Sequence, residues 1–262
     1  MSRRGVDLDS PKDLGQILGD ALALWTANLP TFLGVAAGVV VTVDIIMGAG
    51  LGEITGRYQS NPPLSTVVIE TTISVLVTTP LITAMLVHAV LDLGAGQRPS
   101  IREAITRGLD AFAPVLGAVC IFVLGVVGGF SLFIVPGIFV YVSWYFVTQA
   151  VVVDGARGLA AVARSAALVR GSWWRVLGVV LVIHVAVGLP ENVLGLGVAA
   201  IAKSANSQGV DLAGRMVLEV FAISLEALMG TLLYFDLRAR LEPRRPPAED
   251  PLHETPERPG EA

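Results

Sequence analysis

The residues most able to do chemistry are four acids inside long apolar stretches: Asp44, Glu70, Glu219 and Glu226. A charge at the centre of a membrane-spanning helix costs roughly 2.5–3.5 kcal/mol on insertion scales. Glu219 and Glu226 are seven residues apart, so they share one face of a helix. One interpretation is a polar cavity that binds a cation, a proton or a lipid headgroup. The other is that each carboxyl is neutral or reaches the interface, hydrogen-bonded to threonine hydroxyls within residues 71–79.

A second group of candidate residues combines aromatic rings with basic side chains. Trp173, Trp174 and Arg175 are consecutive, and Arg164 precedes them on the same segment. Tryptophan rings favour the lipid headgroup zone, and guanidinium groups favour anionic phosphates there. These four residues are predicted to anchor the chain at the membrane surface. A specific lipid-headgroup site is the alternative.

The sequence holds no recognised catalytic or metal-binding pattern. It contains no His-Glu-x-x-His segment, nucleophile elbow or phosphate loop. His88 and His184 lack neighbouring ligand residues, so we interpret both as hydrogen-bonded helix histidines. Cys120, the single cysteine, is interpreted as a small buried hydrophobe. We therefore expect no cofactor, no metal and no enzymatic activity.

The composition indicates which solvent surrounds the protein. Of the 262 residues, 53% are hydrophobic and only 15% are charged, whereas a soluble domain carries about 25% charged residues. Lipid is therefore expected to face most of the surface. A net charge of −4 with dispersed basic residues argues against nucleic acid as a partner.

Six apolar stretches are long enough to span a bilayer, which takes roughly 17–25 residues in a helix. They are residues 30–51, residues 64–93, two stretches within residues 113–153, residues 173–189 and residues 216–234. Glycines and prolines between positions 128 and 137 divide the third stretch from the fourth. The predicted fold class is an all-α integral membrane protein with six transmembrane helices in a single domain, residues 1–240.

Prolines are expected to interrupt several of these stretches. Pro80 and Pro136 are expected to kink or break their spans. Pro190 is expected to end the fifth span, so that residues 193–202 re-enter the membrane or lie along its surface. The proline-rich, charged residues 241–262 are predicted to form a disordered cytoplasmic tail.

The distribution of basic residues predicts the orientation. A topology with the N-terminus inside places 15 of the 18 lysine and arginine residues on the cytoplasmic side. Cytoplasmic loops are enriched in these residues. The chain is therefore expected in a bacterial inner membrane, with both termini in the cytoplasm.

The segments between the spans indicate a threefold repeat, with units at about 12–93, 100–154 and 155–240. Each unit begins with apolar residues at helical spacing, which indicates an amphipathic interfacial helix followed by two spans. Those residues are Leu14, Ile17, Leu18 and Ala21; Ile101, Ala104, Ile105 and Gly108; and Leu159, Val162, Ala163 and Ala166. The second span of each unit ends near an aspartate: Asp92, Asp154 or Asp236.

Several motifs in the second and third units resemble a known family. They are Pro136-Gly137-Ile138, Asp154-Gly155 and Gly171-Ser172-Trp173-Trp174-Arg175. This pattern resembles the membrane domain of glycerophosphoryl diester phosphodiesterases and of related six-span bacterial proteins, over roughly residues 12–240. The resemblance implies a six-span membrane domain. We do not expect the family's enzymatic activity, because six spans leave no room for a soluble phosphodiesterase domain.

Two functions remain open at this point. The first is a non-catalytic membrane module that organises lipids or partner proteins, with a membrane or envelope protein as a possible partner. The alternative is a transporter or channel for a small solute, ion or lipid that uses the intramembrane carboxylates. Convergence of the four acids on one cavity favours transport, and their dispersal favours the module.

Overall fold

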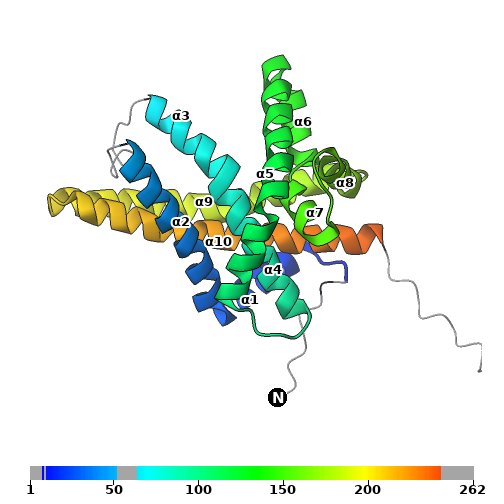
Figure 1. Ribbon diagram of the computed structural model, residues 1–262, viewed down its shortest axis with the longest axis horizontal. Helices are drawn as coiled ribbons and strands as arrows, with labels where there is room; N and C mark the ends of the chain where they lie inside the picture. Colours follow the sequence, from blue (N-terminus) through cyan, green and yellow to red (C-terminus); the bar gives the residue numbers. More distant parts are fainter. Residues whose placement is uncertain (1–7, 9, 52–63, 243–262) are drawn as a thin grey trace, which may run out of the picture.

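The computed structural model describes Leu8, residues 10–51 and residues 64–242, and every regular element in those ranges is a helix (Figure 1). Within this described part, six helical segments are long and apolar enough to cross a membrane. They are Leu29–Ile46, Val67–Gly94, Ile101–Leu132, Ile134–Asp154, Trp173–Ser204 and Gly209–Leu241. The prediction of an all-α chain with six spans is therefore confirmed. The predicted tail lies outside the described residues from position 243 onward.

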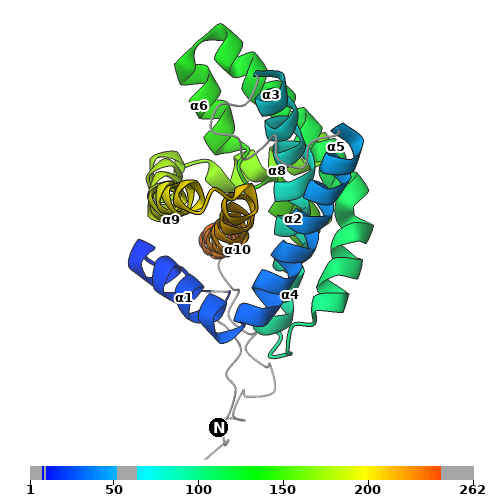
Figure 2. The same ribbon diagram turned by 90° about the vertical axis from the view of Figure 1, so that its left-hand side faces the viewer.

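The helices surround one hydrophobic core. In chain order they are α1 (Leu14–Ala27), α2 (Leu29–Leu51), α3 (Leu64–Ile73), η2 (Ser74–Thr78), α4 (Thr79–Gly94), α5 (Ile101–Leu132), α6 (Ile134–Ser143), α7 (Val147–Asp154), α8 (Leu159–Val169), α9 (Trp173–Ser204) and α10 (Gln208–Leu241). Helices α9 and α10 lie side by side, and the α5–α6 hairpin leaves the centre in another direction (Figures 1 and 2). Because α10 also contacts α1, α2, α4 and α8, it forms the centre of the bundle.

The amphipathic helix α1 packs against the bundle through its apolar face. Ile17 and Ala21 are fully buried on that face. The indole N–H of Trp25 donates to the hydroxyl of Ser224 on α10 at 2.9 Å, and its ring meets Phe221 edge-on at 5.4 Å. The protein interior therefore covers the apolar stripe of α1.

The two prolines expected to disturb spans have different effects. The π-helical segment η2 ends two residues before Pro80, whose nitrogen cannot donate a hydrogen bond. A wider turn accommodates that missing bond within a continuous span. Pro136 lies in the first turn of α6, where no helical donor is required. It therefore starts a helix after the hairpin at Phe133, within the turn region that the sequence predicts.

Two predicted breaks are wrong. The sequence predicts a separate interfacial helix over residues 101–112, yet these residues continue into the third span as α5, through Pro114. Pro190 likewise lies inside α9, so residues 193–202 neither re-enter nor lie apart but complete that helix. Asn192 stays helical, and its amide donates to the Gly188 carbonyl at 2.7 Å. One proline removes only one helical hydrogen bond, and membrane helices tolerate this loss.

The fourth span is interrupted at Trp144, between α6 and α7. Ser165 of α8 is fully buried beside this break. Its hydroxyl accepts a hydrogen bond from the Phe146 backbone N–H at 3.1 Å and donates to the Ser143 carbonyl at 3.0 Å. The hydroxyl thus replaces partners that a continuous helix would supply.

Each of the three aspartates at the ends of the second spans forms an ion pair with a partly exposed arginine. Asp92 pairs with Arg107 at 2.8 Å, Asp154 pairs with Arg164 at 2.6 Å, and Asp236 pairs with Arg175 at 2.6 Å. The backbone N–H of Lys12 also donates to Asp236 at 2.6 Å. Each acid therefore contacts the start of the next predicted unit, and the last contacts the first. This cyclic order agrees with a threefold repeat, which itself stays a prediction.

Candidate intramembrane binding site

A cavity of about 330 Å³ lies where the three second spans meet. Its walls come from η2 and α4, from α5, from the broken span α6–α7, and from α9 and α10. The lining residues are Val75, Thr79, Pro80, Thr83, Val119, Phe122, Tyr141, Trp144, Tyr145, Val147, Thr148, Gln149, His184, Ile223, Glu226, Ala227 and Gly230. The cavity is therefore mostly apolar and aromatic, with a few polar groups between the rings.

The second span of each predicted unit contributes residues to the cavity from equivalent positions along its length. The residues thirteen and nine positions before each terminal aspartate all line it. In the three spans they are Thr79 and Thr83, Tyr141 and Tyr145, and Ile223 and Ala227. The same level of each span thus faces the same cavity, although the side chains differ. The three spans contribute equivalent backbone positions to the cavity, but the different side chains make its surface asymmetric.

The most polar feature of the cavity is a contact between His184 of α9 and Glu226 of α10. The imidazole Nε2 lies 3.1 Å from the carboxyl Oε1. The Tyr141 hydroxyl lies 3.4 Å from the same nitrogen, and the Nδ1 atom lies 2.8 Å from the Val180 carbonyl. The two side chains keep exposed fractions of 42% and 34%, so protein atoms do not fully enclose the pair.

Aromatic rings form a continuous wall beside this pair. Phe122 and Tyr141 have ring centroids 6.0 Å apart, and Tyr141 meets Tyr145 edge-on at 5.8 Å. Tyr145 in turn meets the His184 ring edge-on at 6.3 Å. Such pairs hold their rings in fixed orientations. The wall is therefore shaped before any ligand arrives.

Gln149 adds a buried acceptor to the cavity. The residue is 4% exposed, and its Oε1 atom accepts no hydrogen bond from the described part of the chain. A buried amide oxygen without a partner is costly. On the opposite wall, a side chain at Gly230 would begin 3.7 Å from the Gln149 amide nitrogen and from the Tyr145 hydroxyl. Glycine at position 230 keeps this space open.

The four predicted intramembrane acids are placed differently from one another. Glu226 lines the cavity, whereas Asp44, Glu70 and Glu219 are not among its described lining residues. Asp44 is buried on α2, and Glu70 and Glu219 are half-buried on α3 and α10. Because three of the four acids lie away from the cavity, their positions favour the membrane module over a transporter. Of the four, Glu226 is the one whose position fits a polar cavity.

The predicted interface residues divide into ion pairs and exposed rings. Arg164 bonds Asp154 and Glu242, and Arg175 bonds Asp236. Burial alone lowers the pKa of the Arg164 guanidinium, but these hydrogen bonds raise it above its ordinary value. Trp173 stacks on Phe139 at 5.7 Å. Trp174 is 78% exposed, so it is the residue of this group that is free to meet lipid.

Sequence reasoning missed most of the cavity. It interprets His184 as a helix histidine, and the Nδ1 atom does face a carbonyl of its own helix, but the second nitrogen meets Glu226. Tyr141, Tyr145 and Gln149 recur at spacings of four, which would place them on one face of a continuous helix, so a signal was present in the sequence. Their convergence with His184 depends on contacts between helices more than 40 residues apart, such as Tyr141 with His184.

No protein-family model, curated protein or solved structure matches this chain. Among the described residues, no group of three or more histidine, cysteine, aspartate or glutamate side chains is arranged to hold a metal ion.

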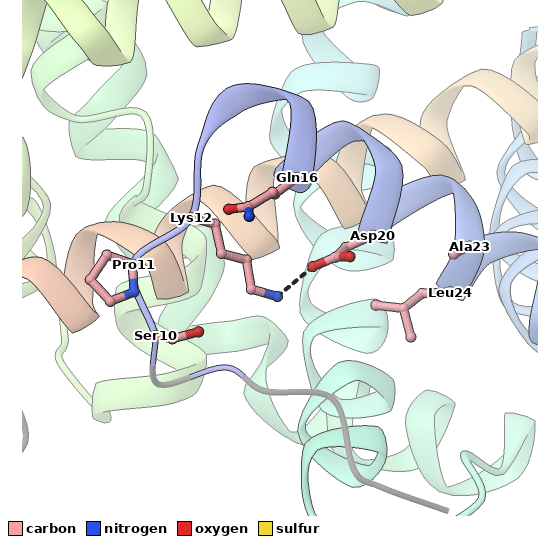
Figure 3. Close-up of a pocket in the computed structure, with 7 residues that line it drawn as sticks. All are labelled: Ser10, Pro11, Lys12, Gln16, Asp20, Ala23 and Leu24. Atoms are coloured by element: carbon pink, nitrogen blue, oxygen red, sulfur yellow. Dashed lines mark hydrogen bonds and ion pairs between the residues drawn. The ribbon is translucent and has the colours of Figure 1, made fainter.

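A second hollow, of about 480 Å³, lies at the start of α1 (Figure 3). Lys12 and Asp20 point toward each other across it and form an ion pair at 2.6 Å. Gln16 accepts a hydrogen bond from the Asp13 backbone at 2.9 Å. Because these polar groups have one another as partners, this hollow is a weaker candidate for a ligand.

Proposed function

We propose that this chain is a non-catalytic polytopic membrane module that binds membrane lipid, with the polar end of one amphiphile in the cavity. The observation that carries the proposal is a mostly apolar cavity with a few polar groups inside a bundle of six apolar helices. Pockets for small molecules have this composition. An amphiphile matches both the polar groups and the apolar walls of the cavity. Its head contacts His184, Glu226 and Gln149, and its tail contacts the apolar walls.

We further propose a location in a bacterial inner membrane with both termini in the cytoplasm. The distribution of lysine and arginine supports this orientation. The resemblance to the membrane domain of glycerophosphoryl diester phosphodiesterases supports a membrane role, and no phosphodiesterase activity is proposed. A membrane or envelope protein is a further candidate partner of such a module.

Filling the cavity tests lipid binding. Gly230→Leu places a branched side chain between Gln149 and Tyr145, so the variant should lose the bound amphiphile. Native mass spectrometry of the purified full chain should show about one retained lipid on the wild type and none on the variant.

The matched control is Gly117→Leu. Gly117 is exposed on α5, and the first carbon of a side chain added there would have no neighbouring atom within 4 Å. This control should retain lipid as the wild type does. Equal lipid retention by the wild type and Gly230→Leu would overturn the proposal.

Transport is the second candidate, since Glu226 and His184 are polar, partly exposed groups that line the cavity between spans. Single cysteines at positions 184 and 226, in a Cys120→Ala background, test it with a membrane-impermeant thiol reagent. A lipid module predicts no labelling from either side. Labelling from both sides would reveal an aqueous path and make transport the better explanation.

A further inference from the structure

An apolar groove of about 300 Å³ lies beside the cavity, between the start of the second span and α5. Residues of α3 and η2 between Val67 and Leu76 form one wall, and Val123 of α5 forms the other. Figure 1 shows α3 and the α5–α6 hairpin pointing in different directions away from the centre of the bundle. Val75 lines both the groove and the cavity, and the cavity residue Phe122 directly precedes Val123 on α5. The groove therefore continues the cavity toward the outside of the bundle.

The groove is accessible from the surface of a membrane-spanning segment. Val67, Val68 and Val75 are 40%, 55% and 38% exposed, and all three belong to the span Val67–Gly94. Thr72 is also exposed, but its hydroxyl already donates to the Val68 carbonyl at 2.7 Å. The walls thus offer mainly apolar surface to the bilayer. An acyl chain is the part of a lipid that such walls suit.

The polar end of the same ligand has to supply a hydrogen-bond donor. The Oε1 atom of Gln149 is buried, lies on a residue that lines the cavity, and accepts no hydrogen bond from the described part of the chain. A buried acceptor without a partner costs free energy. A hydroxyl or N–H group of a bound headgroup would remove that cost.

The cavity does not suit an anionic headgroup. The described lining residues include no lysine or arginine, and Glu226 adds a carboxyl group. A phosphate buried there would lack a cationic partner, which is costly. The phenol groups of Tyr141 and Tyr145 also line the cavity, and each can both donate and accept. A neutral hydroxyl, which likewise donates and accepts, matches these groups better than a phosphate or than an ammonium group, which only donates.

We propose that the cavity and the groove together bind an acylglycerol that enters sideways from the bilayer. A hydroxyl of its neutral head donates to the Oε1 atom of Gln149, and one acyl chain lies in the groove between α3 and α5. This inference rests on the proposed lipid-binding function and names the class of lipid and the place of its chain.

Photolabelling tests the place of the acyl chain. The full chain is reconstituted in phosphatidylglycerol nanodiscs with a monooleoylglycerol analogue that carries a diazirine at mid-chain, and mass spectrometry identifies the labelled residues. The labelling that excess monooleoylglycerol prevents should lie within residues 67–76 and at Val123. Thr72→Trp fills the groove and should abolish this labelling. Thr42→Trp is the matched control, because Thr42 is also exposed in a span and its hydroxyl donates to a carbonyl of its own helix, that of Gly38.

Competition between lipids with the same acyl chain tests the head. Oleoyl lysophosphatidic acid differs from monooleoylglycerol by one phosphate, and at least about tenfold more of it should be needed to displace the probe. Gln149→Leu removes the buried acceptor and should weaken binding of monooleoylglycerol by about fivefold. Because this variant loses a polar group that has no partner, it should unfold at no lower temperature than the wild type.

Several outcomes overturn this inference. Preventable labelling outside the groove, or equal labelling of the wild type and Thr72→Trp, contradicts the place of the acyl chain. Equal competition by lysophosphatidic acid contradicts the neutral head, and tighter binding of oleylamine than of monooleoylglycerol contradicts the hydroxyl. If Gly230→Leu still removes a bound lipid in these cases, the lipid-binding function stands without the acylglycerol. If neither lipid retention nor preventable labelling is found, both proposals fail.

Discussion

Replacing Asp236 by alanine should destabilise the protein by about 3 kcal/mol. The Asp236 side chain has no exposed surface, and it bonds Arg175 at 2.6 Å, Arg240 at 3.0 Å and the Lys12 backbone at 2.6 Å. Its removal leaves two partly buried guanidinium groups without a counter-charge. The same carboxylate also joins the segment before α1 to α9 and α10, so the first and last parts of the chain should separate on heating.

The measurement is thermal unfolding of the detergent-solubilised full chain, followed by the reaction of Cys120 with a thiol-reactive dye. Cys120 is half-buried, so its reactivity should rise on unfolding. Asp236→Ala should lower Tm by on the order of 10 °C. Asp211→Ala is the matched control, because Asp211 pairs with Arg215 one turn along the same helix. That change should cost less than about 1 kcal/mol, and an equal loss in both variants would contradict the central role of Asp236.

Replacing Ser165 by alanine should both destabilise the bundle and disturb the cavity. The change removes the partner of the Phe146 N–H and of the Ser143 carbonyl, and each orphaned buried group costs roughly 1–3 kcal/mol. No water replaces these bonds in an apolar interior. Because the break at Trp144 directs Tyr145 into the cavity, lipid retention should fall as well.

Both effects can be measured on the same preparations. Tm should fall by several degrees in Ser165→Ala, and native mass spectrometry should show less bound lipid than in the wild type. Ser131→Ala is the control, because the Ser131 hydroxyl is exposed and bonds only its own helix, at the Val127 carbonyl. It should change Tm by no more than about 1 °C. A stable Ser165→Ala variant with full lipid retention would show that the break at Trp144 does not depend on this hydroxyl.

The membrane class and the number of spans follow from the apolar pattern of the amino-acid sequence alone. Apolar stretches of sufficient length allow few alternatives in lipid, since a helix satisfies its own backbone hydrogen bonds. The hairpin near residues 128–137 was also predictable, because Gly129 and Gly137 permit a close approach that a side chain would block. A carbon added at Gly129 would lie 2.9 Å from the Gly137 backbone.

Prolines in the sequence predicted helix ends poorly inside the bundle. Pro114 and Pro190 both lie within continuous helices, although prolines often end helices in water. The fourth span breaks instead at Trp144, which carries no breaker signal, because a serine from another helix supplies the missing hydrogen bonds. Whether a helix continues thus depended on which partners the surrounding structure could offer.

The candidate site depends on contacts between helices that are distant in the sequence. Glu226 stood out in the sequence as an acid in an apolar stretch, but so did Asp44, Glu70 and Glu219, and nothing local separated them. His184 becomes the partner of Glu226 only when α9 packs against α10, and the aromatic wall exists only when the broken span α6–α7 packs beside them. The chain's own apolar pattern sets how many helices cross the membrane, whereas polar contacts between distant helices set what the cavity can bind.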